Sequence, residues 1–151
     1  MTKVDNIAAA ILKRTGSINT FKLQKLVYYS EAWHLVWESE SLFEDRIEAW
    51  ANGPVVPALY QKHRTKYIVD VWPDGDAGAL SDNENESIDA VLDFYGEYQG
   101  YQLAELTHQE EPWIRAREGL APGERGNAEI SRESMRIFYE GLVGNTAKPI
   151  Y

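Results

Sequence analysis

The order of apolar and polar positions predicts a mainly helical protein. Apolar residues recur at helical spacing over about 5–14, and Gly16 follows as a terminator, so a first helix is expected there. A longer helix is expected over about 20–38, with Asn19 or Thr20 as its cap. This second segment is apolar around most of its circumference, which is typical of a helix surrounded by others. We therefore expect a compact multi-helix domain built around it.

Two short segments are candidates for strands. Residues 46–50 alternate polar and apolar side chains, and 67–72 is the second candidate. We expect these two to pair as a minor two-stranded β element on the helical body. Between them, the sequence 52–54 (Asn-Gly-Pro) is a strong turn signal. A further helix is expected to begin near Pro54 and to reach about Arg64.

The second half of the chain predicts shorter helices. Ser81 and Glu84 form the pattern of a capping box, which opens a helix ending near Gly96. Three more helices are expected: one over about 101–106, one from Pro112, and a last one capped by Ser131 with Met135, Phe138, Tyr139 and Leu142 on its apolar face. No repeat or interdomain linker interrupts the pattern, so 1–151 is interpreted as a single domain.

Composition narrows the classes of protein. The chain has 151 residues, 44% of them hydrophobic, which suits a soluble domain with its own core. It contains no cysteine, which excludes disulfides, thiolate nucleophiles and cysteine-ligated zinc. The first residues resemble neither a signal peptide nor a membrane span. A cytoplasmic protein without a membrane partner is therefore expected.

The charge of the chain is unevenly distributed. The formal net charge is −9, which disfavours direct nucleic-acid binding because affinity for phosphate comes mainly from Lys and Arg. The 48 residues 67–114 hold no Lys or Arg and twelve Asp or Glu, so the rest of the chain carries 15 − 12 = +3. Two interpretations stay open: a solvated, solubilising face, or a surface that meets a basic partner.

Motifs for catalysis are absent from the sequence. The histidines His34, His63 and His108 lie in separate predicted elements without metal-site spacing, and no glycine-rich phosphate loop or nucleophile elbow occurs. A metal cluster of Asp, Glu and His assembled from separate elements stays open. No cofactor is expected.

Two segments are unusual for their predicted elements. Lys22 and Lys25 stand in the first turns of the 20–38 helix, where cations oppose the helix dipole, so a carboxylate partner is one interpretation and simple solubility is the other. The segment 106–113 joins a polar cluster to Pro-Trp. It is expected to form a capped corner between two helices, with Trp113 packed in the core.

Three segments in this order resemble a known family. Phe21–Tyr29 (FKLQKLVYY), Glu48–Val55 (EAWANGPV) and Leu103–His108 (LAELTH) followed by Pro112-Trp113 resemble the Panacea domain, also called the SocA-like antitoxin or GepA-like phage-associated domain. The resemblance implies a helical antitoxin of a bacterial or prophage type II toxin–antitoxin system, with a role in phage defence. It implies that the protein is not an enzyme and neutralises a cognate protein toxin, encoded by the adjacent gene, through direct binding.

Some relatives in that family carry an added DNA-binding helix-turn-helix, for which this chain has no spare length. Operator binding is therefore not expected, and a homo-oligomer stays open. The candidate residues for partner binding, or for the family motifs, are Lys22, Gln24, Lys25, Tyr28, Trp50, Asn52, Gly53, Pro54, His108, Glu110 and Trp113. Among the motif residues, Lys22, Lys25, Asn52 and His108 are expected to be exposed, and Leu23, Leu26 and Trp113 to lie in the core.

Two alternative functions remain open. The first alternative is an adaptor that delivers a bound toxin to a protease. The second is a small hydrolase that uses His108 with Glu110 or Glu111.

Overall fold

The computed structural model describes residues 2–143 and is mainly helical, as predicted. Its α-helices are α1 (Val4–Thr15), α2 (Thr20–Glu38), α3 (Pro57–His63), α4 (Asp82–Tyr95), α5 (Gly100–His108), α6 (Glu111–Ala116) and α7 (Arg132–Val143). The described residues also contain four short strands and one 3₁₀ turn. The strands are β1 (Ile18–Asn19), β2 (Glu48–Trp50), β3 (Gly53–Val55) and β4 (Ile68–Val69), and the 3₁₀ turn is η1 (Ala77–Ala79).

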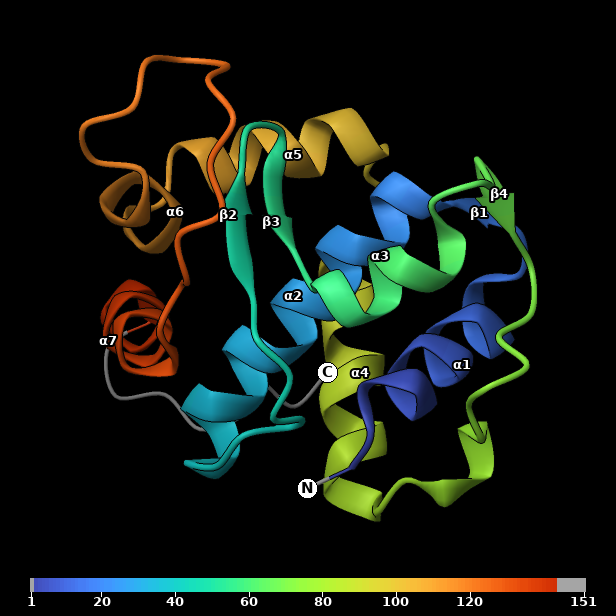
Figure 1. The fold of residues 1–151 in the computed structure, drawn as a ribbon. Helices are drawn as coiled ribbons and strands as arrows, with labels where there is room; N and C mark the ends of the chain where they lie inside the picture. Colours follow the sequence, from blue (N-terminus) through green and yellow to red (C-terminus); the bar gives the residue numbers. More distant parts are fainter. Residues whose placement is uncertain (1, 144–151) are drawn as a thin grey trace.

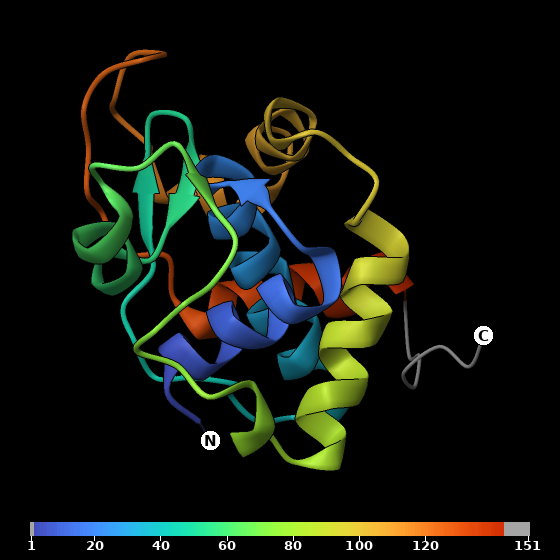
Figure 2. The ribbon, with the colours of Figure 1, turned by 90° about the vertical axis from the view of Figure 1, so that its right-hand side faces the viewer.

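Helix α2 is the centre of the fold. Helices α1, α4, α5 and α7 all pack on it, and α1 and α7 lie on opposite sides of it (Figure 1). Seen from the side, α4 runs past α1 and α2 as an outer layer (Figure 2). Asn19 is the cap, because its Oδ1 accepts from the Lys22 N–H at 2.7 Å. No helix within 2–143 is long and apolar enough to cross a membrane.

Both predicted strand segments contain strands, but the predicted pairing between them is wrong. β2 pairs antiparallel with β3, and β4 pairs with β1. The two-residue turn Ala51-Asn52 folds the chain directly back on β2, so Pro54 lies in β3 opposite Ala49. The missing N–H of Pro54 is tolerated because β3 is an edge strand. Consequently α3 begins at Pro57, three residues later than predicted.

The other edge of β2 is covered by the segment before α7. The Ala49 N–H donates to Ala128 O at 2.8 Å, and the Ile130 N–H donates to Ile47 O at 2.9 Å. This extended stretch runs beside β2 (Figure 1). It places 125–127 near the tip of the β2–β3 hairpin.

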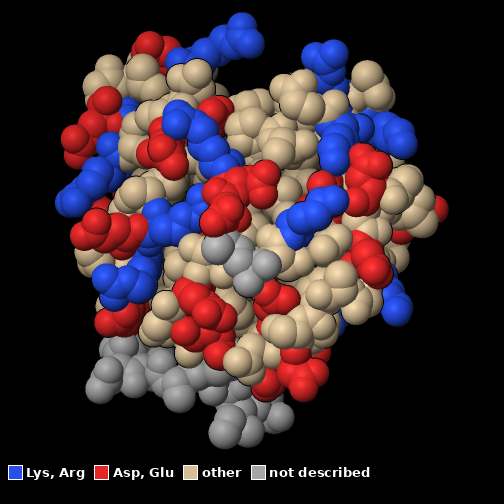
Figure 3. Space-filling model, turned by 60° about the horizontal axis from the view of Figure 1, so that its bottom comes forward, with Lys and Arg blue, Asp and Glu red and all other residues tan. Residues whose placement is uncertain are grey.

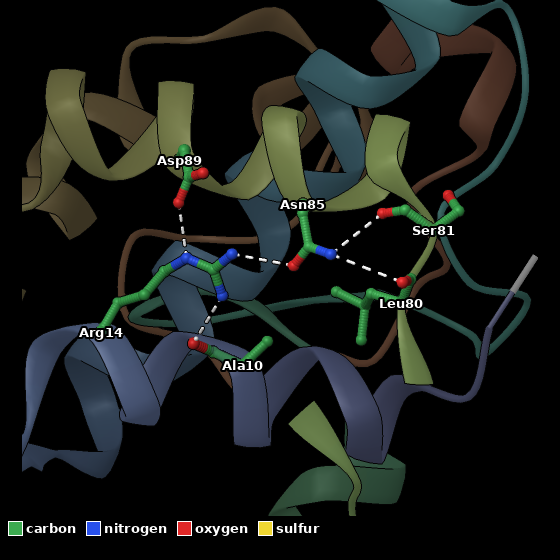
Figure 4. A network of polar contacts seen from close by, with 6 residues as sticks. All are labelled: Ala10, Arg14, Leu80, Ser81, Asn85 and Asp89. Carbon is green, nitrogen blue, oxygen red and sulfur yellow. Dashed lines mark hydrogen bonds and ion pairs between the residues drawn. The ribbon is translucent and has the colours of Figure 1, made fainter. Parts of the chain in front are cut away.

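Polar side chains join α1 to the start of α4. Ser81 and Glu84 form the predicted capping box, with both of its hydrogen bonds present. One turn further on, Asn85 accepts a hydrogen bond from Arg14 at 2.8 Å (Figure 4). Arg14 also forms an ion pair with Asp89. The capping box therefore fixes where α4 begins, and the contacts of Arg14 with Asn85 and Asp89 hold α1 against α4.

Helix α7 is attached to α2 through a buried carboxylate. Glu31 of α2 is fully buried and accepts from the Arg132 guanidinium at 2.7 Å and from the Leu42 N–H at 2.6 Å. The predicted apolar face of α7 packs here through Met135 and Tyr139, which are fully buried. Leu142, predicted on the same face, is instead 56% exposed.

Candidate functional site

The first two family-like motifs meet at the β2–β3 hairpin. The Gln24 side chain of α2 accepts from the Val56 N–H at 2.8 Å and donates to Val56 O at 3.2 Å. Its Nε2 is therefore a donor, so the contact of 3.0 Å with His63 Nε2 makes that ring nitrogen the acceptor. His63 is consequently the neutral tautomer protonated on Nδ1. Burial lowers the pKa of His63, which is consistent with this assignment.

Lys25 lies under the hairpin and was expected to be exposed. Its side chain is fully buried, with Nζ donating to Pro54 O at 3.2 Å and lying 4.1 Å from the centroid of the Phe21 ring. No carboxylate within 2–143 pairs with it, so the predicted partner for the α2 cations is wrong. Burial without a counter-charge lowers the pKa of Lys25 to about 7. Lys22 is half-buried and donates to Gly96 O at 2.6 Å.

Gly53 allows the hairpin to approach this lysine. Its φ is +118°, a conformation that residues with a Cβ rarely adopt. A Cβ there would also lie 2.6 Å from Lys25 Cε and 3.2 Å from Thr107 Oγ1. The turn glycine, the α2 lysine and the third motif are thus in direct contact.

The third motif holds the hairpin from the other side. Trp113 Nε1 donates to Trp50 O at 2.9 Å, and the ring of His108 stacks on Trp113 with centroids 4.1 Å apart. Arg117, which the sequence reasoning missed, is buried, donates to Ala49 O at 3.0 Å and lies over the same indole. Nothing in the sequence distinguished this arginine from its exposed neighbours.

A cleft opens at the hairpin tip, between the start of α2, α3 and 125–127. It measures about 690 Å³, and we call it the hairpin cleft. Its lining residues are Thr20, Phe21, Gln24, Lys25, Trp50, Ala51, Asn52, Gly53, Val55, Tyr60, His63, Arg125, Gly126 and Asn127. Five predicted candidates, Gln24, Lys25, Trp50, Asn52 and Gly53, are therefore brought together. Asn52 is exposed as expected.

Two other candidates lie in a separate buried cluster. Glu110 accepts from the hydroxyls of Tyr29 and Tyr139, each at 2.7 Å, and the Tyr139 oxygen lies 3.1 Å from the Tyr28 hydroxyl, whose O–H is the donor left for this contact. Burial raises the pKa of Glu110, which the two hydroxyl donors partly offset. The cluster joins α2 to α7 and to the start of α6, so Tyr28 and Glu110 have a structural role here.

The geometry does not assemble the dyad expected for a hydrolase. Within 2–143 no hydrogen bond or ion pair joins His108 to Glu110 or Glu111. Glu111 pairs instead with Arg115 at 3.3 Å. Burial, together with the charges of Lys25 and Arg117, lowers the pKa of His108. Among the described residues no group of three or more His, Asp or Glu is placed to hold a metal ion.

Most acidic side chains of 67–114 reach solvent. Ten of the twelve are exposed: Asp70, Asp74, Asp76, Asp82, Glu86, Asp89, Asp93, Glu97, Glu105 and Glu111. A few pair with cations, as Asp74 does with Lys62 at 3.2 Å. On the face drawn in Figure 3, Asp and Glu lie in several groups among uncharged residues and are interspersed with Lys and Arg.

An apolar hollow adjoins the acidic helix α4. It measures about 320 Å³ and lies between α2, α4 and α7. We call it the aromatic hollow; it is lined by Trp33, Trp37, Ala90, Val91, Phe94, Tyr95 and Leu142. Phe94 is 62% exposed at its edge. Sequence reasoning placed Trp33, Trp37, Val91, Tyr95 and Leu142 on the apolar faces of their helices but did not anticipate a shared surface.

Comparison with protein families shows to which family the chain belongs. The profile of the SocA-like antitoxin, Panacea domain family matches residues 23–114, more than half of the chain. The match spans all three motifs that surround the hairpin, except for the first residues of α2. The chain therefore belongs to the SocA-like antitoxin, Panacea domain family. No match was found among curated proteins or among solved structures.

Proposed function

We propose that this member of the SocA-like antitoxin family is the antitoxin of a bacterial or prophage type II toxin–antitoxin pair. It neutralises a protein toxin, encoded by the adjacent gene, by binding to it directly in the cytoplasm. Family membership supports a role as an antitoxin. No step of chemistry in a pocket of its own is required, because inhibition follows from covering the active site of the toxin.

The observation that carries the proposal is the aromatic hollow beside acidic α4. Exposed apolar patches on soluble domains mark interaction sites, and aromatic side chains supply most binding energy in protein interfaces. Phe94 lines the hollow, and Asp93 next to it is exposed on the same helix. An apolar anchor site with acidic neighbours suits a toxin whose contact surface is basic with apolar side chains at its centre.

The acidic surface increases the rate at which the protein associates with the toxin. Many toxins act on RNA or nucleotides through basic active sites, and a surface rich in Asp and Glu attracts such a site. Electrostatic attraction acts mainly on the association rate, whereas the buried aromatic contacts act on the dissociation rate.

Co-expression with the adjacent gene tests the proposal. The neighbour alone is expected to stop growth, and this chain is expected to restore it and to co-purify with the neighbour as a complex of fixed stoichiometry. A harmless neighbour, or one that remains lethal beside this protein, would rule out the antitoxin function. Rescue that disappears in a protease-deficient host would identify a protease adaptor instead, because direct blockade survives loss of the protease.

The contact face is tested with two exposed aromatic residues. Phe94→Ala at the hollow is expected to weaken toxin binding by about thirtyfold, since an aromatic interface anchor contributes about 2 kcal/mol. Tyr67→Ala is the matched control, because Tyr67 is 73% exposed, lies next to β4 and is not among the residues that line the hollow. Surface plasmon resonance measures both. Equal affinities for the two variants would place the contact face elsewhere.

A further inference from the structure

The hairpin cleft has a chemistry unlike the rest of the surface. None of its lining residues is Asp or Glu, in a chain with 24 of them. All of its lining residues lie outside the acidic segment 67–114, in the part of the chain whose formal charge sums to +3. The residues that line the cleft therefore present no carboxylate to an anion.

Cationic and amide donors surround the cleft. Arg125 is exposed at its rim, and no hydrogen bond or ion pair ties its guanidinium to another residue of the described chain. Lys25 lies buried at its floor and makes one hydrogen bond, to Pro54 O, so its amine keeps further N–H donors for a ligand. Asn52 and Asn127 add amide groups near Arg125. Guanidinium and ammonium groups together bind carboxylates and phosphates.

Aromatic rings form the other part of the lining. The rings of Trp50 and Tyr60 meet edge to face, with centroids 4.9 Å apart, and Phe21 lies near the floor beneath Lys25. Such rings offer flat surfaces on which a planar ligand stacks. The volume of the cleft falls within the range of small-molecule sites, about 300–1,000 Å³.

We propose that the hairpin cleft binds a small anionic ligand that carries a flat ring, with the ring against Trp50 and Tyr60 and the anionic group toward Arg125 and Lys25. A nucleoside monophosphate and an aromatic carboxylate share this chemistry. The site is separate from the aromatic hollow, so a bound ligand and a bound toxin occupy different faces. The inference does not depend on the antitoxin function.

Calorimetric titration of the purified full chain tests the site without any toxin. The probes are AMP, GMP, CMP, UMP and indole-3-acetate. At least one is expected to bind with a dissociation constant of about 100 μM or tighter. Inorganic phosphate and the parent nucleoside, or indole for the carboxylate, are each expected to bind about tenfold more weakly, because each fills only half of the cleft. Binding of the nucleoside monophosphates identifies the anionic group as a phosphate, and binding of indole-3-acetate identifies it as a carboxylate.

Variants then place the ligand. Arg125→Gln is expected to weaken binding by about tenfold, the loss of one charge-assisted contact. Arg136→Gln makes the same charge change on α7, where Arg136 pairs with Glu140, and is expected to stay within about twofold. In amide spectra, the Trp50 indole N–H is expected to shift with ligand. Absence of binding below about 1 mM for every probe, equal weakening by both variants, or an unmoved Trp50 signal would each overturn the proposal.

Discussion

Lys25 illustrates how burial changes the meaning of a residue type. In the sequence, a lysine in the first turns of a helix is typical of a solvated cation, and nothing marks it as buried. The structure places it under the hairpin, where its aliphatic stem fills space and its amine reaches Pro54 O. Only the path of the β2–β3 hairpin, which is a tertiary feature, creates that environment.

The lowered pKa of Lys25 predicts how stability changes with pH. Its folded pKa of about 7 lies below the unfolded value of 10.5, so the unfolded chain binds more protons between these limits. The free energy of unfolding should therefore rise from pH 7 toward pH 10, by something on the order of 3 kcal/mol. Lys25→Met should remove most of this rise. Urea unfolding of both proteins at pH 6.5, 8 and 9.5 measures the difference.

The comparison between the two proteins isolates Lys25 from other groups. Burial and the charge of Lys25 lower the pKa of both His63 and His108 below the ordinary value of 6.5, so between pH 8 and 9.5 both imidazoles are neutral in the folded and in the unfolded chain. Parallel pH profiles for wild type and Lys25→Met would contradict the prediction. They would mean that the amine keeps its full charge in the folded protein.

Gly53 predicts a second effect at the residue scale. Gly53→Ala is expected to lower the free energy of unfolding by about 3 kcal/mol, because the strain of φ +118° adds to a Cβ placed 2.6 Å from Lys25 Cε. Gly123→Ala is the matched control. Gly123 has φ +80° but open space around the added Cβ, so a loss of only about 1 kcal/mol is expected. Similar losses in thermal unfolding would show that crowding by Lys25 contributes nothing.

At the scale of elements, the helices could be predicted where caps mark them. Asn19, Gly16 and the Ser81 capping box each satisfy end groups of a helix by local contacts, so α1, α2 and α4 begin and end within a residue or two of the predicted positions. The strands could not be predicted as well. Their pairing depends on which chain lies alongside, and β1 is only two residues long.

The candidate site was visible in the sequence as three motifs but not as one structure. Gln24, Lys25, Trp113 and Arg117 each bind a backbone group of the hairpin or of Val56, which follows it. Every residue has a backbone carbonyl group, so the sequence does not show which of these groups accepts a hydrogen bond from a side chain. The motif positions could therefore be named, whereas the hairpin that they hold, and the cleft at its tip, required the fold.

The attachment of α7 gives a prediction at this scale. Glu31→Gln is expected to lower the free energy of unfolding by about 3 kcal/mol, because it removes one partner of a buried ion pair and leaves the Arg132 guanidinium without its counter-charge. Hydrogen exchange of the α7 amides should accelerate more than that of α4. Glu140→Gln, which breaks the exposed pair with Arg136, should cost less than about 0.5 kcal/mol. Equal protection of α7 in the two variants would contradict the assigned role of Glu31.

At the scale of the whole molecule, the acidic segment 67–114 and the rest of the chain form surfaces of different charge. Segment 67–114 supplies α4, α5 and their loops, where ten of its twelve acids are exposed. The hairpin cleft is built from the remainder, which carries a small positive sum. Acidic side chains on α4 lie beside the aromatic hollow. An acidic protein thus offers two surfaces of different character, one suited to a basic partner and one to a small anion.

With the proposed antitoxin function, this division predicts which step of toxin binding depends on the acidic surface. The triple variant Glu86→Gln, Asp93→Asn, Glu97→Gln removes three exposed charges on and just after α4. It should slow association by about tenfold at low salt and leave the dissociation rate nearly unchanged, because long-range attraction acts before contact. The difference should shrink at 0.5 M NaCl, where charges are screened over a few ångströms.

A second triple variant, Glu44→Gln, Glu118→Gln, Glu133→Gln, makes the same change in net charge at exposed sites outside 67–114. Stopped-flow association with the toxin should remain within about twofold of wild type, since the position of a charge near the approach path matters more than the total. Equal slowing by both triples would assign the effect to net charge alone. Unchanged association in the first triple would mean that the acidic face only keeps the protein soluble, and that the aromatic contacts by themselves select the partner.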